Sequence, residues 1–327
     1  MSSFATDRAR SSNRPLSIVV LLGGWSAERE VSLASGRAVV GALRSRGHDV
    51  REFDPAEMDF FAYPWAGADA AFIALHGPFG EDGTVQSLLD QMRTPYTGSG
   101  PQASRLAMSK SASKQRFRAT GLATPNGHTV HVLEAKDSAV QKAEAIGYPL
   151  VVKPDGQGSS IGVSMLESPH GLDEALEMAY RHDPLVVLEK FIPGREVTVA
   201  VLERRPLPPI EIQSGRAFFD FQAKYHDDTT RYVFDLDLPA GVIGRIEGAA
   251  VAAVDALGCT GVTRVDMRLD PQHEPWVLEV NTVPGLTDHS LVPKAAQRAG
   301  ISFAELCEQL VLAKLSPATE ANITRAA

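Results

Sequence analysis

The segment that most constrains this chain is residues 261–281, GVTRVDMRLDPQHEPWVLEVN, which has the pattern of a β-hairpin with one polar face. Side chains two residues apart share a face of a strand. The first strand alternates Val265, Met267 and Leu269 with Arg264, Asp266 and Arg268, and the second alternates Trp276, Leu278 and Val280 with Val277, Glu279 and Asn281. Asp270 and Pro271 between them favour a turn. We expect the apolar sets that begin with Val265 and Trp276 to face one core.

The polar face of this hairpin predicts a metal site. A register that sets Asp266 opposite Glu279 also sets Arg264 opposite Asn281. Two directly opposed carboxylates repel each other, so a cation is expected between them. Carboxylate and amide oxygens are hard ligands that suit Mg²⁺ or Mn²⁺. A solvated strand face with mixed charges is the alternative that this stretch alone leaves open.

Composition excludes two classes of partner. With 327 residues, 44% of them hydrophobic and 22% charged, the chain has the length of two or three globular domains. Its net charge of −8 argues against a nucleic-acid binder that relies on phosphate contacts. Since no apolar run reaches the length of a membrane span, we expect neither nucleic acid nor a membrane among its partners.

The N-terminal residues and the cysteines indicate the compartment. Residues 1–14 are polar, with arginines but no apolar core, so they do not form a secretory signal and we expect a disordered leader. Cys259 and Cys307 lack metal-type spacing, which favours buried thiols in a reducing cytosol. We therefore expect a cytoplasmic protein.

The first domain, predicted over residues 15–104, begins as a doubly wound α/β unit. LSIVVLL at residues 16–22 is typical of a buried parallel strand, and a periodic helix and strands at 49–53 and 70–75 follow. Glu28 lies at the start of the helix, where a favourable dipole placement is the simple explanation. His76 follows the third strand, at the edge where open α/β sheets bind ligands, although a lone histidine is more often structural.

The second domain, predicted over residues 105–194, carries lysines and a glycine-rich loop. A helix over 103–120 holds Lys110 and Lys114, and a short strand ends at Lys153. The loop at 155–162, DGQGSSIG, has many backbone N–H groups that can wrap phosphates, with a plain hairpin turn as the alternative. It lacks the GK[ST] ending of a P-loop.

The third domain, predicted over residues 195–327, contains the hairpin and two irregular polar stretches. Strands at 185–191 and 195–202 flank its start, a helix is expected over 241–257, and an amphipathic helix over 302–315 closes the chain. Residues 213–232 are polar and aromatic without periodicity. A loop of this length in a compact protein is usually a lid or a binding loop.

Several of these segments, in this order, carry a family resemblance. They are GGWSAEREVSLASG (23–36), ALHGPFGEDGTVQ (74–86), PYTGSG (95–100), VVKPDGQGSSIGVS (151–164), LEKFIPGREVTV (188–199), AKY (223–225), TRVDMRLD (263–270) and LEVNTVPGLTDHSLVP (278–293). From residue 16 to about residue 313 the chain resembles the D-alanine–D-alanine ligases of the ATP-grasp superfamily. The implied fold is a mixed α/β (α+β) ATP-grasp fold, whose central and C-terminal domains clamp ATP. Trp25 departs from the pattern, since smaller residues are common there.

The resemblance implies a nucleotide site and a metal site. The residues that would hold ATP are Lys110, Lys153 and Lys224 at the phosphates, Gly158 and Ser160 in the covering loop, Glu189, Lys190 and Ile192 in the hinge against adenine, and Glu196 at the ribose. Asp266, Glu279 and Asn281 would hold two Mg²⁺ ions, with Mn²⁺ as a substitute. A homodimer is implied as well.

The resemblance also implies the D-alanine sites. Glu28 would take the ammonium of the first D-alanine, with His76 near its carboxylate; Arg264 and the N–H of Gly285 would form an oxyanion hole; Ser290 and the N–H of Leu291 would hold the second carboxylate; and Tyr225, Ser159 and Glu28 would form a hydrogen-bonded bridge. The implied reaction joins two D-alanine molecules through an acylphosphate, for peptidoglycan synthesis. Acylphosphates hydrolyse in water, so a lid over the site is chemically required.

Three other functions compete with this interpretation. A sister enzyme that makes D-alanyl-D-lactate is the nearest alternative. A nicotinamide oxidoreductase is suggested by the strand, Gly23-Gly24 and helix, but it would need a glycine fingerprint. A non-catalytic ATP sensor would be expected to lack a metal ligand or Arg264, and both are present.

The first prediction concerns Tyr225, because relatives that make the ester carry another residue at this position. The wild type should form D-alanyl-D-alanine at neutral pH with little ester even in excess D-lactate. Tyr225→Phe removes the hydroxyl that closes the bridge, so the ester-to-dipeptide ratio should rise, most visibly near pH 6, where the competing amine is more protonated. Product partition with both acceptors measures this, and an unchanged partition would remove Tyr225 as the specificity residue.

Overall fold

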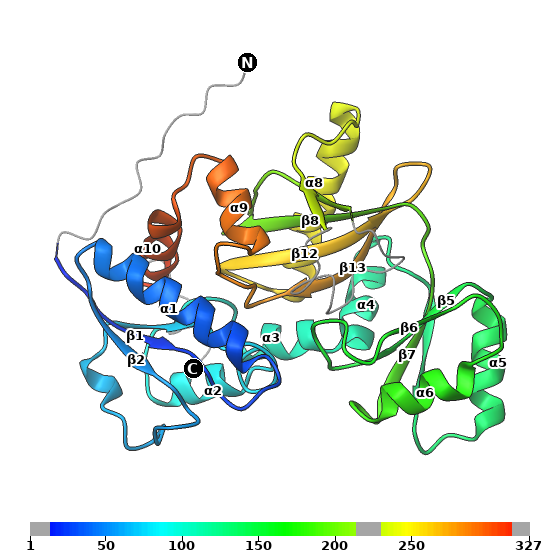
Figure 1. Cartoon of the computed structure of the whole chain (residues 1–327), viewed down its shortest axis with the longest axis horizontal. Helices are drawn as coiled ribbons and strands as arrows, with labels where there is room; N and C mark the ends of the chain where they lie inside the picture. The colour runs from blue at the N-terminus through cyan, green and yellow to red at the C-terminus, as the bar shows by residue number, and fades with distance from the viewer. Residues whose placement is uncertain (1–13, 214–229, 316–327) are drawn as a thin grey trace. The chain divides into compact units, whose positions relative to one another are not determined.

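The structure, a computed structural model, describes residues 14–213 and 230–315 (Figure 1). It has the predicted mixed α/β architecture, with one parallel sheet and two antiparallel sheets. Lys224, Tyr225, most of the predicted lid and the predicted leader up to residue 13 lie outside these residues. None of the helices that the structure describes combines the length and the apolar character needed to span a membrane.

The N-terminal part is built on a three-stranded parallel sheet with the order β2-β1-β3. Its strands are β1 (Ser17–Leu21), β2 (Asp49–Phe53) and β3 (Ala70–Ile73). The apolar run of β1 is buried on both faces, as expected for a central parallel strand. One face packs against α2 (Thr84–Gln91), Phe60 and Trp65.

Four helices accompany this sheet. They are α1 (Arg29–Ser45), α2, α9 (Leu291–Arg298) and α10 (Phe303–Lys314), with a short 3₁₀ turn at Trp65–Gly67. Helix α1 packs along α10 and against β1 and β2. A capping box formed by Ser302 and Glu305 starts α10, so the end of the described chain returns to the first sheet.

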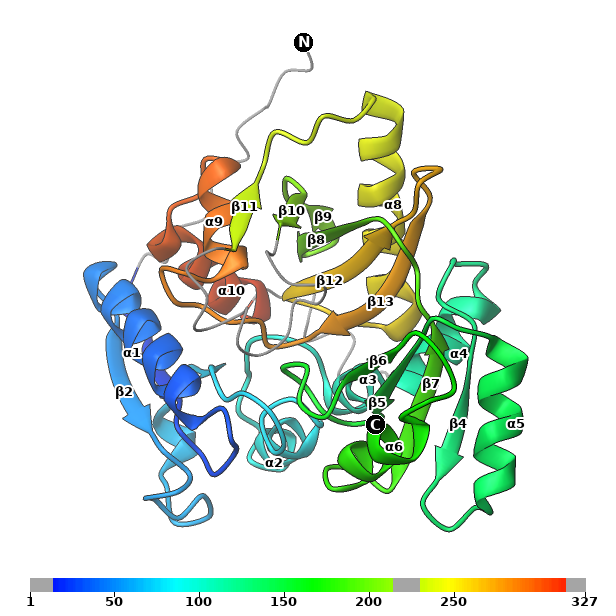
Figure 2. The ribbon, with the colours of Figure 1, turned by 45° about the vertical axis from the view of Figure 1, so that its right-hand side comes forward.

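The second sheet is antiparallel, with the order β4-β7-β5-β6. Its strands are β4 (Gly127–His131), β5 (Leu150–Pro154), β6 (Ser164–Leu166) and β7 (Leu185–Lys190), and its helices are α5 (Lys136–Ile146) and α6 (Leu172–Tyr180). Both helices lie beside this sheet (Figure 2). Their side chains pack with Val152 and Leu188, which point to the same face. Alternation therefore turns Val151, Lys153 and Glu189 to the other face.

The predicted single helix over 103–120 is two helices, α3 (Pro101–Met108) and α4 (Lys110–Ala119). The chain breaks at Ser109, which has an extended backbone and whose hydroxyl accepts the N–H of Ala112. Asp155 reinforces this break, because its carboxylate accepts from Ser109 Oγ at 2.6 Å and from Ser111 N at 2.6 Å. The N-cap thus starts α4 at Lys110, which fixes where that lysine points.

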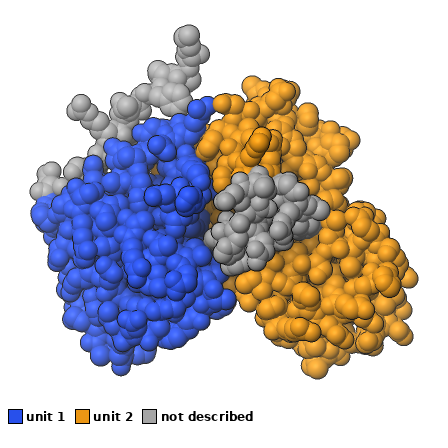
Figure 3. Space-filling view, viewed as in Figure 1, with its two compact units in different colours: residues 1–101, 283–327 blue, residues 102–282 orange. Residues whose placement is uncertain are grey.

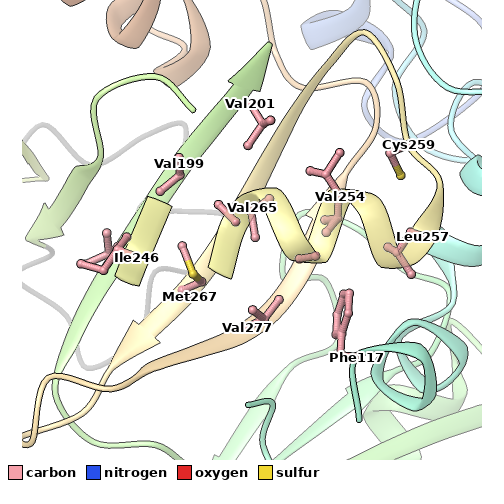
Figure 4. Close-up of a cluster of buried hydrophobic side chains, with 14 of the residues drawn as sticks. Phe117, Val199, Val201, Ile246, Val254, Leu257, Cys259, Val265, Met267 and Val277 are labelled. Carbon is pink, nitrogen blue, oxygen red and sulfur yellow. The ribbon is translucent and has the colours of Figure 1, made fainter. Parts of the chain in front are cut away.

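The third sheet has the strand order β11-β10-β8-β12-β13, and β9 pairs with β8. The strands are β8 (Arg195–Leu202), β9 (Arg205–Pro206), β10 (Ile210–Gln213), β11 (Arg231–Val233), β12 (Val262–Leu269) and β13 (Pro275–Asn281). Helix α8 (Ala240–Leu257) lies across one face of this sheet (Figure 4). Its Ile246 and Val254 pack with Val199, Val265 and Val277 in a core without exposed side chains.

The predicted hairpin is confirmed, including its register. Asp266 pairs with Glu279 and Arg264 pairs with Asn281. The turn is held by Asp270, whose carboxylate accepts from Gln272 N, Glu274 N and Trp276 Nε1, each at 2.9 Å.

The alternation expected for the second hairpin strand is wrong over part of its length. A β-bulge falls between Asp266 and Met267, so that Met267 pairs with Val277 and Leu278 is the additional residue. The bulge turns Val277 into the core, where it is fully buried, and leaves Leu278 partly exposed beside Glu279. The polar face of the hairpin therefore gains an apolar side chain.

By its internal contacts the chain forms two compact units, residues 1–101 with 283–327 and residues 102–282 (Figure 3). The predicted boundaries, 15–104, 105–194 and 195–327, remain a proposal for how the chain divides. The compact units differ from them at the C-terminus, since α9 and α10 belong with the first sheet.

Because of the bulge, we expect the smaller of two neighbouring side chains, Val277, to contribute more to stability than the larger, Leu278. Val277→Ala opens a cavity in the core and should lower the free energy of unfolding by about 2 kcal/mol. Leu278→Ala removes more atoms but from a partly exposed side chain, and should cost less than about 1 kcal/mol. Urea unfolding measures both. Uninterrupted alternation predicts the opposite order, so a larger loss for Leu278→Ala would contradict the bulge.

Candidate active site

A pocket in the unit of residues 102–282 collects most of the predicted nucleotide residues. It lies between the face of the second sheet that α5 and α6 leave uncovered and the polar face of the third sheet. The predicted residues that line it are Lys110, Lys153, Ser160, Glu189, Lys190, Ile192, Glu196, Asp266 and Glu279. Seven more residues line it: Gln157 and Phe191 belong to the predicted loop and hinge, and Pro125, Val151, Val163, Arg268 and Leu278 were not predicted as site residues.

A buried ion cluster lies at the centre of this pocket's wall. The carboxylate of Glu189, on β7, contacts Lys114 Nζ at 2.8 Å and also pairs with Lys153 Nζ. Burial by itself would raise the pKa of Glu189, but the two lysines outweigh burial and lower it to about 2. Burial lowers the pKa of Lys114 to about 8, against the opposing pull of Glu189. At neutral pH the cluster thus holds two cations around one carboxylate, which leaves a surplus of positive charge.

Lys114 is the member of this cluster that sequence reasoning missed. Its side chain is only 2% exposed, and its Nζ also donates to Thr124 Oγ1 at 3.2 Å. The signal was its spacing: Lys110 and Lys114 lie four residues apart and so share one face of α4. Such spacing is common on solvated helices, so only the position of Glu189 distinguishes this case.

Lys110 links the glycine-rich loop to the hairpin. Its Nζ donates to the carbonyl of Gln157 at 2.5 Å and lies 3.6 Å from Glu279 Oε2. Its backbone is fixed as well, because Lys110 N donates to Asp155 O at 3.1 Å. The predicted phosphate lysine therefore projects into the pocket from a capped helix start.

The loop after β5 has an unusual left-handed backbone at two adjacent serines. Ser159 and Ser160 both have positive φ angles, 53° and 57°, which non-glycine residues rarely adopt. Gly156 N is anchored by Asp183 Oδ2 at 2.8 Å, and Ile161 N donates to Gly158 O at 3.2 Å. Consecutive turns of this kind present backbone N–H groups to a bound anion.

The polar face of the hairpin has the predicted donors, with a charge arrangement that the sequence did not predict. Asp266 accepts from Arg264 Nε at 2.9 Å and Nη2 at 2.7 Å, from Thr198 Oγ1 at 2.6 Å and from Asn281 Nδ2 at 3.1 Å. Arg264 therefore neutralises Asp266, while Lys110 lies beside Glu279. Two protein cations balance the two opposed carboxylates.

The donor set of this face fits a hard divalent cation. Asp266, Glu279 and Asn281 occupy adjacent register positions and offer only oxygen ligands together with one amide nitrogen. Within the described ranges, no group of three histidine, cysteine, aspartate or glutamate side chains forms a metal site, so an asparagine has to complete this one. An ion here would also require Arg264 to release Asp266.

In the other unit, the predicted first-substrate residues lie close together. Ser26 Oγ donates to the carbonyl of His76 at 2.7 Å and accepts from Glu28 N at 3.1 Å, which places Glu28 next to His76 at the start of α1. Gly77 faces them with a φ of 73°, and a Cβ there would lie 3.1 Å from Glu28 Oε2. A side chain at Gly77 would therefore crowd Glu28 and would also strain the left-handed backbone.

His76 itself is held from both sides of its ring. Its Nε2 lies 3.2 Å from Ser35 Oγ and its Nδ1 lies 3.4 Å from Glu81 Oε1. Ser35 Oγ also accepts from Leu286 N at 3.2 Å, so this serine contacts both the His76 ring and the Leu286 backbone. Ser35 was not predicted, and it ties His76 to the segment that carries Gly285.

The predicted second-substrate residues lie at the start of α9. Ser290 is the N-cap residue, and its Oγ accepts from Thr287 N at 3.0 Å. Leu291 is the first residue of the helix, where backbone N–H groups and the helix dipole favour an anion. Gly285 faces this turn, and a Cβ there would lie 2.8 Å from Ser290 Oγ.

The remaining predicted groupings stay predictions. Arg264 and Ser159 lie in the unit of residues 102–282, whereas Glu28 and Gly285 lie in the other unit. Lys224 and Tyr225 lie outside the residues that the structure describes. The oxyanion hole and the bridge through Tyr225 therefore carry over as proposals.

Comparison with known proteins identifies a family whose sequence models match this chain. The family D-ala D-ala ligase C-terminus matches residues 117–312, and D-ala D-ala ligase N-terminus matches residues 54–99. A D-alanine--D-alanine ligase from Nitrosomonas europaea is 45% identical over 294 residues, 90% of this chain and 95% of the relative. One from Bordetella avium is 46% identical over 292 residues, 88% of this chain and 91% of the relative.

Solved structures with a similar fold are ligases as well. The D-alanine--D-alanine ligase of Bacillus anthracis complexed with ATP has a TM-score of 0.83 at 32% identity, covering 94% of this chain and 99% of that one. A D-Ala:D-Ser ligase from Enterococcus faecalis has a TM-score of 0.80 at 30% identity, covering 91% of this chain and 99% of that one.

The low pKa of Glu189 predicts a specific pH dependence of stability. A carboxylate whose pKa falls from 4.5 unfolded to about 2 folded stabilises the protein above pH 4.5, and this contribution is lost as the pH falls toward 2. Glu189→Gln should therefore lower the free energy of unfolding by on the order of 3 kcal/mol at pH 7. The difference between wild type and variant should shrink between pH 4.5 and 3.

Urea unfolding of both proteins at several pH values measures this difference. Glu177, an exposed carboxylate on α6, offers the control Glu177→Gln, for which we expect no such pH-dependent difference. A gap between wild type and Glu189→Gln that stays constant down to pH 3 would contradict the ion cluster.

Proposed function

The chain belongs to the D-alanine–D-alanine ligase family, and from this premise we propose how its residues divide the reaction. ATP and two D-alanine molecules give D-alanyl-D-alanine, ADP and phosphate, through an acylphosphate of the first D-alanine. The observation that carries the proposal is the pocket in which Lys110, Lys153, Asp266 and Glu279 converge. The dipeptide would supply peptidoglycan precursor synthesis in the cytoplasm.

In the first step the carboxylate of one D-alanine attacks the γ-phosphorus of ATP. The reactants are all anionic, so the protein's task is to position them and to neutralise charge. Lys110 and Lys153 line the pocket with ammonium groups, and the loop with Gly158 and Ser160 adds backbone N–H groups. Lys224 is proposed to join them at the γ-phosphate.

The cofactor we propose is Mg²⁺, two ions per site, with Mn²⁺ as a substitute. Asp266, Glu279 and Asn281 would hold it, and it would supply charge neutralisation at the transferred phosphoryl group. Arg264 would then turn from Asp266 toward the reacting carbonyl. The fork that Arg264 now makes with Asp266 keeps the carboxylate oriented.

In the second step the amine of the second D-alanine attacks the acyl carbon. The tetrahedral intermediate carries negative charge, which Arg264 and the N–H of Gly285 would stabilise. Glu28 would hold the first ammonium beside His76, and Ser290 with the N–H of Leu291 would hold the second carboxylate. Ser159 and Tyr225 would close the bridge over the first substrate. A homodimer is part of the proposal as well.

Alternative second substrates define the test. One solved relative is named a D-Ala:D-Ser ligase, and the D-lactate ester was the nearest alternative from the sequence. Phosphate release from ATP is measured with no acceptor, with D-alanine, and with D-alanine plus D-serine or D-lactate, and products are identified by mass. We expect release that requires D-alanine and a D-alanyl-D-alanine product. Equal phosphate release without D-alanine, or mixed products in preference to the dipeptide, would reject the proposal.

The metal assignment predicts the behaviour of Glu279→Gln. The amide preserves the shape of the side chain and removes one of the two opposed charges, so the fold should persist while Mg²⁺ affinity and activity fall together. A loss of several kcal/mol of transition-state stabilisation is expected when a metal carboxylate is removed. Activity at limiting Mg²⁺ measures it, and a variant within about a factor of three of the wild type would exclude Glu279 as a ligand.

A further inference from the structure

Arg268 is a pocket residue to which the proposed reaction assigns no role. It lies on β12, two residues after Asp266, and lines the nucleotide pocket. Its side chain is 16% exposed. An arginine in that position adds a fixed charge and five N–H donors to a site whose other cations are lysines.

Each nitrogen of the Arg268 guanidinium faces a different acceptor on the β7–β8 connection or at the start of β8. Nε donates to the carbonyl of Ile192 at 3.1 Å, Nη2 donates to the carbonyl of Gly194 at 2.8 Å, and Nη1 lies 3.4 Å from Glu196 Oε2. The guanidinium also lies 5.3 Å from the ring centre of Phe191. One side chain thus contacts Phe191, Ile192 and Gly194 in the hinge that joins the second and third sheets, and Glu196 just after it.

The backbone of the hinge itself is also restrained. Pro193 has a fixed φ and no N–H. Gly194 has a φ of 120°, and a Cβ there would lie 2.1 Å from Leu269 O, so the connection is pressed against the end of β12. Among these restraints, the Arg268 fork is the one that a substitution can remove without altering the hinge sequence.

We propose that Arg268 is a positioning residue of the nucleotide site, which holds the hinge backbone and the Glu196 carboxylate ready for ATP. The inference rests on the proposed function in one respect, that Glu196 receives the ribose hydroxyls. Arg268 and Glu196 form a cross-strand pair on β12 and β8, so the arginine sets the direction of that carboxylate. A carboxylate held in place loses less entropy when it accepts hydroxyl hydrogen bonds.

The test compares nucleotide binding by calorimetry in Arg268→Met, Arg268→Lys and wild type. Arg268→Met should raise the Kd for ATP about ten- to thirtyfold, the range expected when a charged hydrogen-bonding group is lost. Lysine keeps the charge, but one ammonium cannot reach three separate acceptors. Arg268→Lys should therefore weaken ATP binding by nearly the same factor, and a Kd equal to that of the wild type would overturn the proposal.

A second readout separates positioning from a general loss of structure. At saturating ATP, kcat should stay within about threefold of wild type while KM for ATP rises and KM for D-alanine does not. The preference for ATP over 2′-deoxy-ATP and 3′-deoxy-ATP should shrink in Arg268→Met, because a misdirected Glu196 reads the hydroxyls poorly. An undiminished preference would overturn the role assigned to Glu196.

A double-mutant cycle with Glu196→Gln completes the test. If Arg268 acts through Glu196, the double variant should bind ATP no worse than about threefold beyond the weaker single variant, whereas independent effects would multiply. Arg245 offers the matched control. Its side chain is 46% exposed, donates to the carbonyl of His273 and does not line the pocket. Arg245→Met should leave ATP binding unchanged.

The outcomes distinguish this inference from the proposed function. A wild type that binds ATP but forms no dipeptide would reject the proposed function and leave the role of Arg268 testable by binding. A wild type that makes dipeptide, together with an Arg268→Met variant that binds ATP as tightly, would reject the role of Arg268 alone. Thermal unfolding of each variant establishes that it is folded at the assay temperature.

Discussion

The pairing of β12 with β13 is the constraint on which the site depends. Its register sets Asp266 against Glu279, and its bulge turns Leu278 to the same side while Val277 enters the core under α8. One strand pair therefore supplies the carboxylates and an apolar lining side chain, and its Arg268 donates hydrogen bonds to the hinge backbone. A slip of one residue would exchange these faces and bury the charges.

Charge balance decides how this polar face can exist inside the protein. Opposed carboxylates and clustered lysines would each be unfavourable alone, but Arg264 pairs with Asp266, Lys110 approaches Glu279, and Glu189 lies between Lys114 and Lys153. These pairs orient the side chains before any substrate arrives. In the function that we propose, ATP would exchange partners with groups that already point into the pocket, so the site would be preorganised.

Sequence reasoning recovered what depends on local pattern and missed what depends on partners. The alternation of apolar and polar residues predicted the hairpin and its register, and the turn was readable at Asp270 and Pro271. The bulge was not readable, because Val277 and Leu278 are both apolar and either can face a core. The break at Ser109 and the burial of Lys114 depend on Asp155 and Glu189, which lie far along the chain.

We propose that the carboxylates of the hairpin hold the metal that accompanies the nucleotide. The most direct measurement is the number of Mn²⁺ ions bound per chain in the presence of saturating ATP, counted by electron paramagnetic resonance of the unbound ion. The account predicts two ions in the wild type and fewer in a folded Asp266→Asn variant, since two-metal sites depend on their carboxylates. The same number of nucleotide-dependent ions in both proteins would contradict it.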